Sequence, residues 1–223
     1  INNLAHVQFK QGKIAEASKN YRRAIALKPN FAPPYNNLGL IMWKKQQNYD
    51  SALTLFSIAL DRYDPVTTLP EKIAQIHLNR ADVFETTRQF DSASAAYYNA
   101  MMSGLGKTFR KAAAFYARIG MHQYTDSLFK RARHLQDLTA VDQFNWGLSF
   151  MERKLYSEGV LKMRLALKID PTLYQAWYCI AVTYYEMDES RDSVDYYLNQ
   201  CLDLAPEYPA AVDLNKLLDK GKN

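Results

Sequence analysis

The sequence of 223 residues predicts an all-α fold, a solenoid of about six helical hairpins followed by a capping helix. Residues 3–29 hold two short apolar stripes at helical spacing, which are separated at Gly12 and closed by Pro29. Similar helix pairs recur about every 34 residues. A single hairpin of this size cannot bury its apolar faces, so the pattern requires hairpins stacked on one another.

The second helix of each predicted hairpin carries a small residue with a large residue three positions earlier. The small side chain lets two helices approach closely, and the large one fills the space beside it. The small residues are Ala24, Ala59, Ala100, Ala132, Ala166 and Cys201, and the large ones are Tyr21, Phe56, Tyr97, Phe129, Met163 and Leu198. The first helices carry pairs of their own: Leu4/Ala5, Leu38/Gly39, Arg80/Ala81, Ala112/Ala113, Trp146/Gly147 and Ile180/Ala181.

These positions divide the chain into repeats that form one solenoid over residues 1–223. The expected repeats are 1–31, 32–65, 74–105, 106–139, 140–173 and 174–207. The junction over 63–73 is irregular, because Pro65 and Pro70 stop one helix and start a longer one. One residue is inserted near 46–48 and another near 188–191. The capping helix over 209–220 is predicted from apolar residues on one side, namely Ala210, Val212, Leu214, Leu217 and Leu218.

The repeat pattern resembles the tetratricopeptide repeat family along essentially the whole chain. The second repeat carries the pattern at Tyr35, Leu38, Gly39, Ala52, Phe56 and Ala59, and the sixth at Trp177, Ile180, Ala181, Tyr184, Cys201 and Pro206. The resemblance implies a right-handed superhelix whose first helices line a concave groove. It is specific for fold and weak for function, since this architecture serves many unrelated partners.

Composition limits the class of protein. No run approaches the roughly 20 apolar residues of a membrane span, and the first residues do not resemble a signal peptide, so we expect a soluble chain, cytoplasmic or periplasmic, with no direct membrane insertion. Because Ile1 lies inside an apparent helix, we expect that a segment upstream has been removed. The two cysteines, Cys179 and Cys201, are expected to be small buried thiols.

The sequence predicts no catalytic, cofactor-binding or metal site, and no cofactor. The four histidines fall in different repeats without companion ligands at metal spacing, and no phosphate-binding glycine loop or nucleophile elbow occurs. The basic run from Lys107 to Arg133 contains one acid, Asp126. It is interpreted as a solvated face and not as a nucleic-acid site, because no aromatic residues interleave with the charges in a nucleic-acid motif.

The resemblance places the sixth residue of each repeat in the groove, and four of six are asparagine: Asn3, Asn37, Asn79, Lys111, Asn145 and Cys179. An asparagine amide both donates and accepts, so a ladder of amides can hold the backbone of an extended peptide. A similar ladder lines the tetratricopeptide region of O-GlcNAc transferase, which the opening repeats resemble. The alternative is that asparagine is only a solvated residue at this position.

The predicted groove changes in character along the chain. Besides the four asparagines, its residues are Trp43, Lys44, Arg110, Lys111, Arg118, Phe144, Leu148, Met151, Tyr178, Val182 and Tyr185. A basic middle beside an apolar, aromatic end suits a partner segment with acidic residues and hydrophobic anchors. The alternative is that the apolar residues pack between neighbouring first helices or under the capping helix.

One subtype of the family is excluded by its motif. Tetratricopeptide co-chaperones that grip a C-terminal carboxylate use lysine, asparagine and arginine at set positions, which are Asn2, His6, Asn37, Gln75 and Asn79 in this sequence. Only Asn37 matches, so a chaperone carboxylate clamp is not expected.

The predicted function is therefore a non-enzymatic scaffold that binds an extended peptide or helix of a partner protein in its groove. Two alternatives stay open at this point. The chain could be the tetratricopeptide region of a larger enzyme such as a glycosyltransferase, or a membrane-anchored assembly factor that resembles pilus and secretion lipoproteins.

Overall fold

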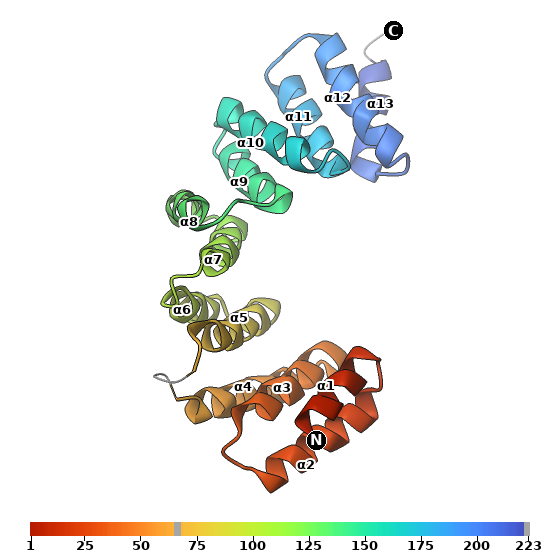
Figure 1. Cartoon of the computed structure of the whole chain (residues 1–223). Coiled ribbons are helices and arrows are strands. Elements are labelled where there is room, and N and C mark those ends of the chain that lie inside the picture. The colour runs from red at the N-terminus through yellow and green to blue at the C-terminus, as the bar shows by residue number, and fades with distance from the viewer. Residues whose placement is uncertain (65–67, 221–223) are drawn as a thin grey trace. The chain divides into compact units, whose positions relative to one another are not determined.

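The computed structural model describes residues 1–64 and 68–220, and all regular elements within those residues are α-helices. The predicted all-α class is confirmed. The helices follow one another in pairs along the chain (Figure 1): α1 (Asn2–Lys10), α2 (Ile14–Leu27), α3 (Ala32–Gln46), α4 (Tyr49–Arg62), α5 (Pro70–Thr86), α6 (Phe90–Met101), α7 (Gly106–Arg118), α8 (His122–Leu135), α9 (Ala140–Glu152), α10 (Tyr156–Ile169), α11 (Tyr174–Glu186), α12 (Arg191–Leu204) and α13 (Pro209–Lys220).

The chain forms two compact units, Ile1–Thr108 and Phe109–Asn223. In the first unit, α1/α2, α3/α4 and α5/α6 are hairpins, with α2 packed against α3 and α4 packed against α5. The second unit repeats this arrangement through α9/α10 and α11/α12, with α8 packed against α9 and α13 packed against α12. Five of the six predicted repeats each contain two of these helices; in the third, predicted over 74–105, α5 begins earlier, at Pro70. That all repeats form one solenoid stays a prediction.

The small and large residues of the second helices form the core, as the sequence predicts. All twelve are buried. Gly39 in α3 shows how close the helices come, because a Cβ atom placed there would lie 2.8 Å from the ring of Phe56 in α4. The residues that recur at near-constant spacing along the sequence are therefore the ones that make the close contacts within each hairpin.

Every hairpin turn contains one residue in the left-handed region of backbone space. The residues are Gly12, Gln47, Arg88, Gly120, Lys154 and Asp188, with φ between 52° and 77°. A left-handed residue after the last helical turn lets the backbone satisfy the final carbonyl groups of the first helix. Only two of the six are glycine, so the backbone conformation of the turn recurs in every hairpin although the residue at this position varies.

The irregular junction predicted over 63–73 contains two prolines, Pro65 and Pro70. Pro65 lies outside the described residues. Pro70 is the first residue of α5, whose 17 residues make it the longest described helix. Proline suits this position, because the first helical residue needs no N–H donor within the helix.

The buried side of α13 differs from the predicted one. Ala211, Leu214 and Leu218 are buried in a cluster with α11 and α12, whereas Leu217 is 52% exposed. Each residue turns about 100° around a helix, so Leu217 lies about 100° from Leu218, outside the face that Ala211, Leu214 and Leu218 share. Apolar composition alone therefore assigned Leu217 to the wrong side.

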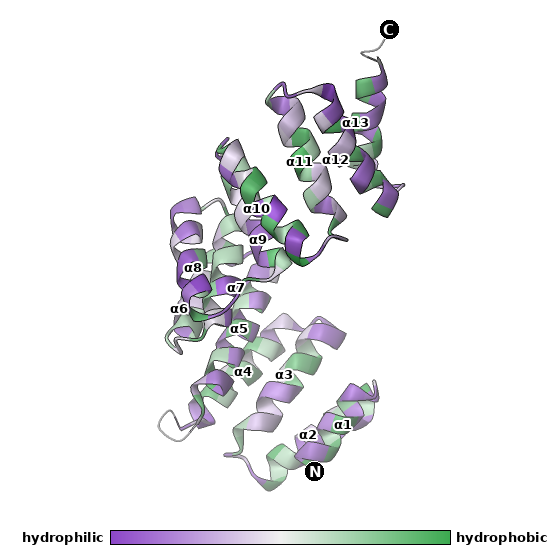
Figure 2. Cartoon of the chain, turned by 45° about the horizontal axis from the view of Figure 1, so that its top comes forward, coloured by the Kyte–Doolittle hydropathy of each residue, from purple (hydrophilic) through white to green (hydrophobic). Residues whose placement is uncertain are grey.

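Figure 2 shows hydrophobic and hydrophilic residues along the helices of both units. Among the described residues, no helix combines the length and the apolar character that crossing a membrane requires.

Candidate functional site

The predicted asparagine ladder places one of its members inside the protein. Asn79 in α5 is 5% exposed, and its amide accepts a hydrogen bond from Gln75 (3.1 Å) and donates one to the Oδ1 atom of Asn36 in α3 (3.3 Å). This amide links two neighbouring first helices. Binding a peptide through Asn79 would require these hydrogen bonds to break.

The other ladder positions are more accessible. Asn3 in α1 is exposed, and Asn37 in α3 and Asn145 in α9 are half-buried. The Oδ1 atom of Asn37 accepts a hydrogen bond from Asn36 at 3.4 Å, which connects it to the Asn79 amide network. The ladder stays a prediction, with Asn3 and Asn37 as its accessible members in the first unit.

Arg110, predicted as a basic residue of the groove, is held in an ion pair. Its Nη1 atom lies 2.6 Å from the Oδ2 atom of Asp142 in α9, and both side chains are largely buried. Asp142 also accepts a hydrogen bond from the backbone N–H of Thr139 and completes a capping box at the start of α9. Arg110 therefore contributes to the packing of α7 and α9.

The remaining polar groove residues lie at the surface. Lys44, Lys111 and Arg118 are exposed, and the Lys44 ammonium group lies 4.8 Å from the ring centre of Trp43. Trp43 is half-buried against the core of the first unit. The Lys44/Trp43 pair thus offers a cation and an aromatic edge on α3.

Most of the apolar groove residues take part in packing between helices. Phe144, Leu148 and Met151 lie against a buried cluster of α10 and α11, and Tyr178 and Val182 lie against the cluster that includes α13. All five are half-buried. Tyr185, in contrast, is 45% exposed.

Three of the predicted residues line one small pocket. Met151 of α9 and Tyr178 and Val182 of α11 enclose a volume of about 190 Å³, completed by Tyr156, Cys179, Thr183 and Glu186. The Thr183 hydroxyl bridges the two helices, because it donates to the carbonyl of Cys179 (2.7 Å) and lies 3.6 Å from the sulfur of Met151. We call this the α9/α11 pocket.

Cys179 shapes the chemistry of the α9/α11 pocket. Burial, followed by the proximity of Cys201, raises the pKa of the Cys179 thiol to about 12, and burial raises the pKa of Cys201 to about 11. Both thiols are free and stay protonated near neutral pH. The pocket is therefore an apolar site with an acidic edge at Glu186.

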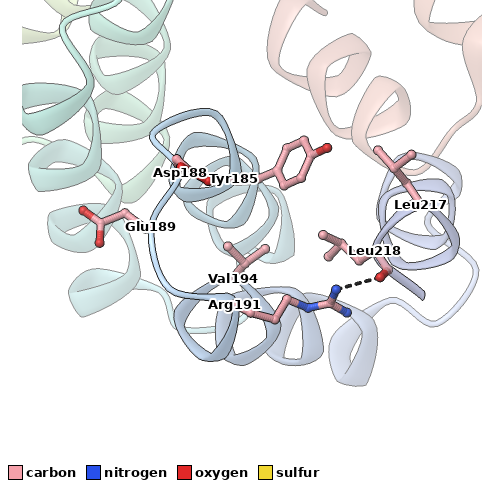
Figure 3. Close-up of a pocket in the computed structure, with 7 residues that line it drawn as sticks. All are labelled: Tyr185, Asp188, Glu189, Arg191, Val194, Leu217 and Leu218. Carbon is pink, nitrogen blue, oxygen red and sulfur yellow. Dashed lines mark hydrogen bonds between the residues drawn. The ribbon is translucent and has the colours of Figure 1, made fainter. Parts of the chain in front are cut away.

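A larger pocket in the last repeat was not predicted. It measures about 570 Å³ and is lined by Tyr185, Asp188, Glu189, Arg191, Val194, Leu217 and Leu218. Figure 3 shows that these side chains come from the end of α11, the turn that follows it, the start of α12 and the end of α13. We call this the C-terminal pocket. Tyr185, a predicted groove residue, lines this pocket, and the residue inserted near 188–191 was a further signal in the sequence.

A polar network around Asp126 was also missed. Its carboxylate accepts a hydrogen bond from the indole of Trp146 (2.9 Å) and two from Arg153 (2.9 and 3.1 Å). The Trp146 ring stacks on Phe129 at 5.4 Å, and the Lys162 ammonium group lies 3.6 Å from its centre. The sequence signal for this network was limited to the isolated acid within the basic run, because Trp146 and Arg153 both lie beyond that run.

The histidines lie apart from the pockets. His122 in α8 is 2.9 Å from the Ser149 hydroxyl. Burial, followed by the charge of Arg80, lowers the pKa of His77 to about 4, so its ring is neutral near neutral pH. No group of three or more His, Cys, Asp or Glu side chains with the geometry to hold a metal ion occurs in residues 1–64 and 68–219.

Comparison with known sequences identifies the repeat type in the first part of the chain. Residues 5–46 match a family described as TPR repeat, and residues 44–102 match one described as tetratricopeptide repeat. No curated protein sequence matches the chain significantly. The resemblance of the opening repeats to O-GlcNAc transferase stays a prediction.

Several solved structures share the fold, two of which are described as TPR proteins. PilF of Pseudomonas aeruginosa is 12% identical, with 96% of this chain and 95% of that chain covered and a TM-score of 0.77. The C-terminal part of a TPR repeat-containing protein from Cytophaga hutchinsonii is 14% identical, with 93% and 80% covered and a TM-score of 0.74. YrrB, described as a TPR protein with an unusual peptide-binding site, is 18% identical, with 89% and 99% covered and a TM-score of 0.68. At these identities the similarity shows the fold, an α-solenoid.

Proposed function

The chain carries tetratricopeptide repeats, and we propose that it is a non-enzymatic scaffold that binds an extended peptide or helix of a partner protein along its first helices. Repeats of this family generally serve as protein-interaction scaffolds. Helices that are already ordered lose little entropy on binding, which favours recognition of a flexible segment.

The α9/α11 pocket is the observation that supports this proposal most directly. It gathers Met151, Tyr178 and Val182, three residues that the repeat pattern assigns to the groove. A volume of about 190 Å³ suits one apolar side chain of a peptide, and the neighbouring Thr183 and Glu186 are polar. In this proposal the pocket holds a hydrophobic anchor, and the amides of the exposed Asn3 and the half-buried Asn37 hold backbone groups.

The structure changes which partner charges fit best. Because Arg110 is neutralised by Asp142, the cations that remain for an acidic residue of the partner include Lys44 on α3. Glu186 at the rim of the α9/α11 pocket favours a basic residue beside the hydrophobic anchor.

The test starts from a displayed library of random 12-residue peptides selected on the full chain. The selected peptide is then titrated by calorimetry against Val182→Asp in the pocket and Tyr196→Asp, a matched change at an exposed position of α12. We expect Val182→Asp to raise the Kd at least about tenfold and Tyr196→Asp to leave it unchanged. If circular dichroism shows that both variants are folded and both bind the peptide with equal affinity, the α9/α11 pocket is not its binding site.

The amide ladder is tested separately with Asn3→Ala/Asn37→Ala. These residues are accessible, whereas Asn79→Ala would disturb the contact between α3 and α5. The double variant should bind the selected peptide severalfold more weakly. Its preference among peptide side chains should not change, because the amides bind backbone groups. An unchanged affinity would remove the ladder from the proposal.

The enzyme-region and membrane-anchored alternatives remain predictions. PilW, whose structure is described as that of a type IV pilus biogenesis factor, is 16% identical over 78% of both chains with a TM-score of 0.66. This similarity supports a common fold and does not favour either alternative.

A further inference from the structure

The ring of Trp146 in α9 is contacted from both neighbouring second helices. Its indole N–H donates to Asp126 of α8 at 2.9 Å, and the ammonium group of Lys162 in α10 lies 3.6 Å from its ring centre. The ring itself is 2% exposed. The side of α8 that carries Asp126 and the side of α10 that carries Lys162 therefore lie close together.

Two further cations share that side of α8. Each residue turns about 100° around a helix, so Lys130 and Arg133, four and seven residues after Asp126, lie within about 40° of it. Both are exposed, and neither side chain forms a hydrogen bond or an ion pair with any residue of 1–64 or 68–220. We call Lys130, Arg133 and Lys162 the α8/α10 cation cluster.

The charges of the α8/α10 cation cluster are close enough to act on one another. Burial, followed by the charge of Arg133, lowers the pKa of Lys162. The charge of Lys130 acts in the same direction, and that of Asp126 opposes it. Because like charges repel, an anion bound among these three side chains would lower their electrostatic free energy.

The acids of the two helices do not neutralise the cluster. Together α8 and α10 carry six lysine and arginine side chains and two acids, Asp126 and Glu158. Both carboxylate oxygens of Asp126 are occupied, because they accept hydrogen bonds from Trp146 and Arg153. Glu158 lies one turn before Lys162 and is exposed, and in the described part of the chain it forms no ion pair with that lysine.

The donors of the α8/α10 cation cluster suit a compact oxyanion. Lys130 and Lys162 offer ammonium groups, and Arg133 offers a planar guanidinium fork. A phosphate monoester carries nearly two negative charges and three acceptor oxygens near neutral pH, so it can accept hydrogen bonds from both helices at once, whereas a carboxylate carries one charge. Because the Trp146 ring is buried, it offers no surface on which a nucleic-acid base could stack.

We propose that Lys130, Arg133 and Lys162 bind a phosphoryl group, supplied as free phosphate or as a phosphate monoester on a partner molecule. The site joins α8 to α10 across Trp146. It lies on second helices and shares no residue with the α9/α11 pocket, so it does not depend on the proposed peptide binding.

The first measurement is a nuclear magnetic resonance titration of the full, nitrogen-15-labelled chain at about pH 7.5 and a constant ionic strength of about 150 mM. The probes are inorganic phosphate, a short glycine–alanine peptide with phosphoserine at its centre, and the same peptide with serine. We expect the indole N–H signal of Trp146 to shift saturably with a phosphate-bearing probe and not with the serine peptide, because a bound anion moves the Lys162 ammonium group relative to the ring.

The two phosphate-bearing probes distinguish the sources. Tighter binding of the phosphoserine peptide assigns the site to a phosphorylated partner, and tighter binding of inorganic phosphate assigns it to the free anion. The proposal is overturned if neither probe shifts the Trp146 signal saturably, or if the serine peptide shifts it equally.

Matched variants separate this site from general attraction to a positive surface. Lys130→Gln/Arg133→Gln removes two charges of the cluster from exposed side chains. Arg131→Gln/Lys168→Gln removes two exposed charges of the same helices, at positions turned about 160° from Arg133 and about 120° from Lys162. The first variant should raise the Kd of the tighter probe at least about tenfold, and the second should change it less than about twofold. Equal weakening by both would indicate non-specific attraction and overturn the proposal.

Lys162→Gln tests the contribution of α10. It should also raise the Kd severalfold, and a thermal melt of this variant shows whether losing the contact with Trp146 affects folding. If the melt is unchanged, binding equal to that of the wild type would overturn a site shared between α8 and α10. If the melt is altered, Lys130→Gln/Arg133→Gln decides, because neither of its side chains forms a hydrogen bond or an ion pair within the described residues.

Discussion

The guanidinium group of Arg110 and the carboxylate of Asp142 form an ion pair with a distance of 2.6 Å between Nη1 and Oδ2, and the pair connects α7 to the first turn of α9. The same carboxylate accepts a hydrogen bond from the backbone N–H of Thr139, 2.8 Å away. One acidic side chain therefore caps a helix and neutralises a cation from the preceding repeat.

Replacing Asp142 should reveal both roles. In Asp142→Ala, the backbone N–H of Thr139 loses its acceptor in the capping box and the largely buried Arg110 is left without its partner, so we expect the free energy of unfolding to fall by about 3 kcal/mol in urea titrations. Asp137→Ala is the control, because Asp137 is exposed in the same junction. A loss as small as that of the control would show that the ion pair contributes little to stability.

Alanine at Gly39 should strain the contact between α3 and α4. Its Cβ atom would lie 2.8 Å from the fully buried ring of Phe56, which cannot bend away, so we expect a loss of about 2 kcal/mol in unfolding free energy. Gly39→Ala/Phe56→Leu should lose less than the sum of the two single changes. Strictly additive losses would contradict a direct clash.

Gly147 provides a matched comparison for Gly39 in the second unit. A Cβ atom at Gly147 would lie 3.0 Å from the end of the flexible Met163 side chain. Because methionine can adjust its terminal torsion, Gly147→Ala should destabilise less than Gly39→Ala in the same urea titration. An equal or larger loss would show that the clash with the backbone oxygen of Gly159, 3.2 Å from that Cβ atom, determines the loss of stability.

Removing the Asp126 carboxylate should destabilise the second unit. Asp126→Ala leaves the Trp146 indole and the Arg153 guanidinium without their shared acceptor, and we expect a loss of about 3 kcal/mol in unfolding free energy. Near-ultraviolet circular dichroism should also change, because the ring of Trp146 stacks on Phe129. Glu158→Ala, at an exposed position of α10, should change neither quantity.

His77 should make stability depend on pH. Burial lowers the pKa of its ring to about 4 in the folded chain, below the ordinary value of 6.5, so the unfolded chain binds the proton more tightly. This contribution is complete above about pH 6.5, and it is lost as pH falls from 6.5 to about 4.

The measurement for His77 is urea unfolding from pH 7.5 to pH 4. In His77→Gln the loss of stability on acidification should be smaller than in the wild type by about 1 kcal/mol, allowing for screening of a partly exposed ring. His134→Gln, at an exposed position of α8, serves as the control. Identical pH profiles for the wild type and His77→Gln would contradict a lowered pKa.

The repeat pattern was readable from the sequence because it reflects contacts within a hairpin. A small residue such as Ala59 and a large one such as Phe56 lie one turn apart on the same helix, so their spacing records the packing directly. The residues they predict as core are buried. The position of Pro70 at the start of α5 was also predictable, because proline acts on its own backbone.

The tertiary structure decided which polar residues are free, because their partners lie in the neighbouring repeat. Asn79 meets Asn36 across 43 residues of sequence, and Arg110 meets Asp142 across 32. No helical periodicity relates such pairs, and a side chain at a groove position is exposed or occupied depending on what the next hairpin presents. The sequence by itself therefore determined the hairpins and their core, while the stacking of one hairpin on the next determined the surfaces available for binding.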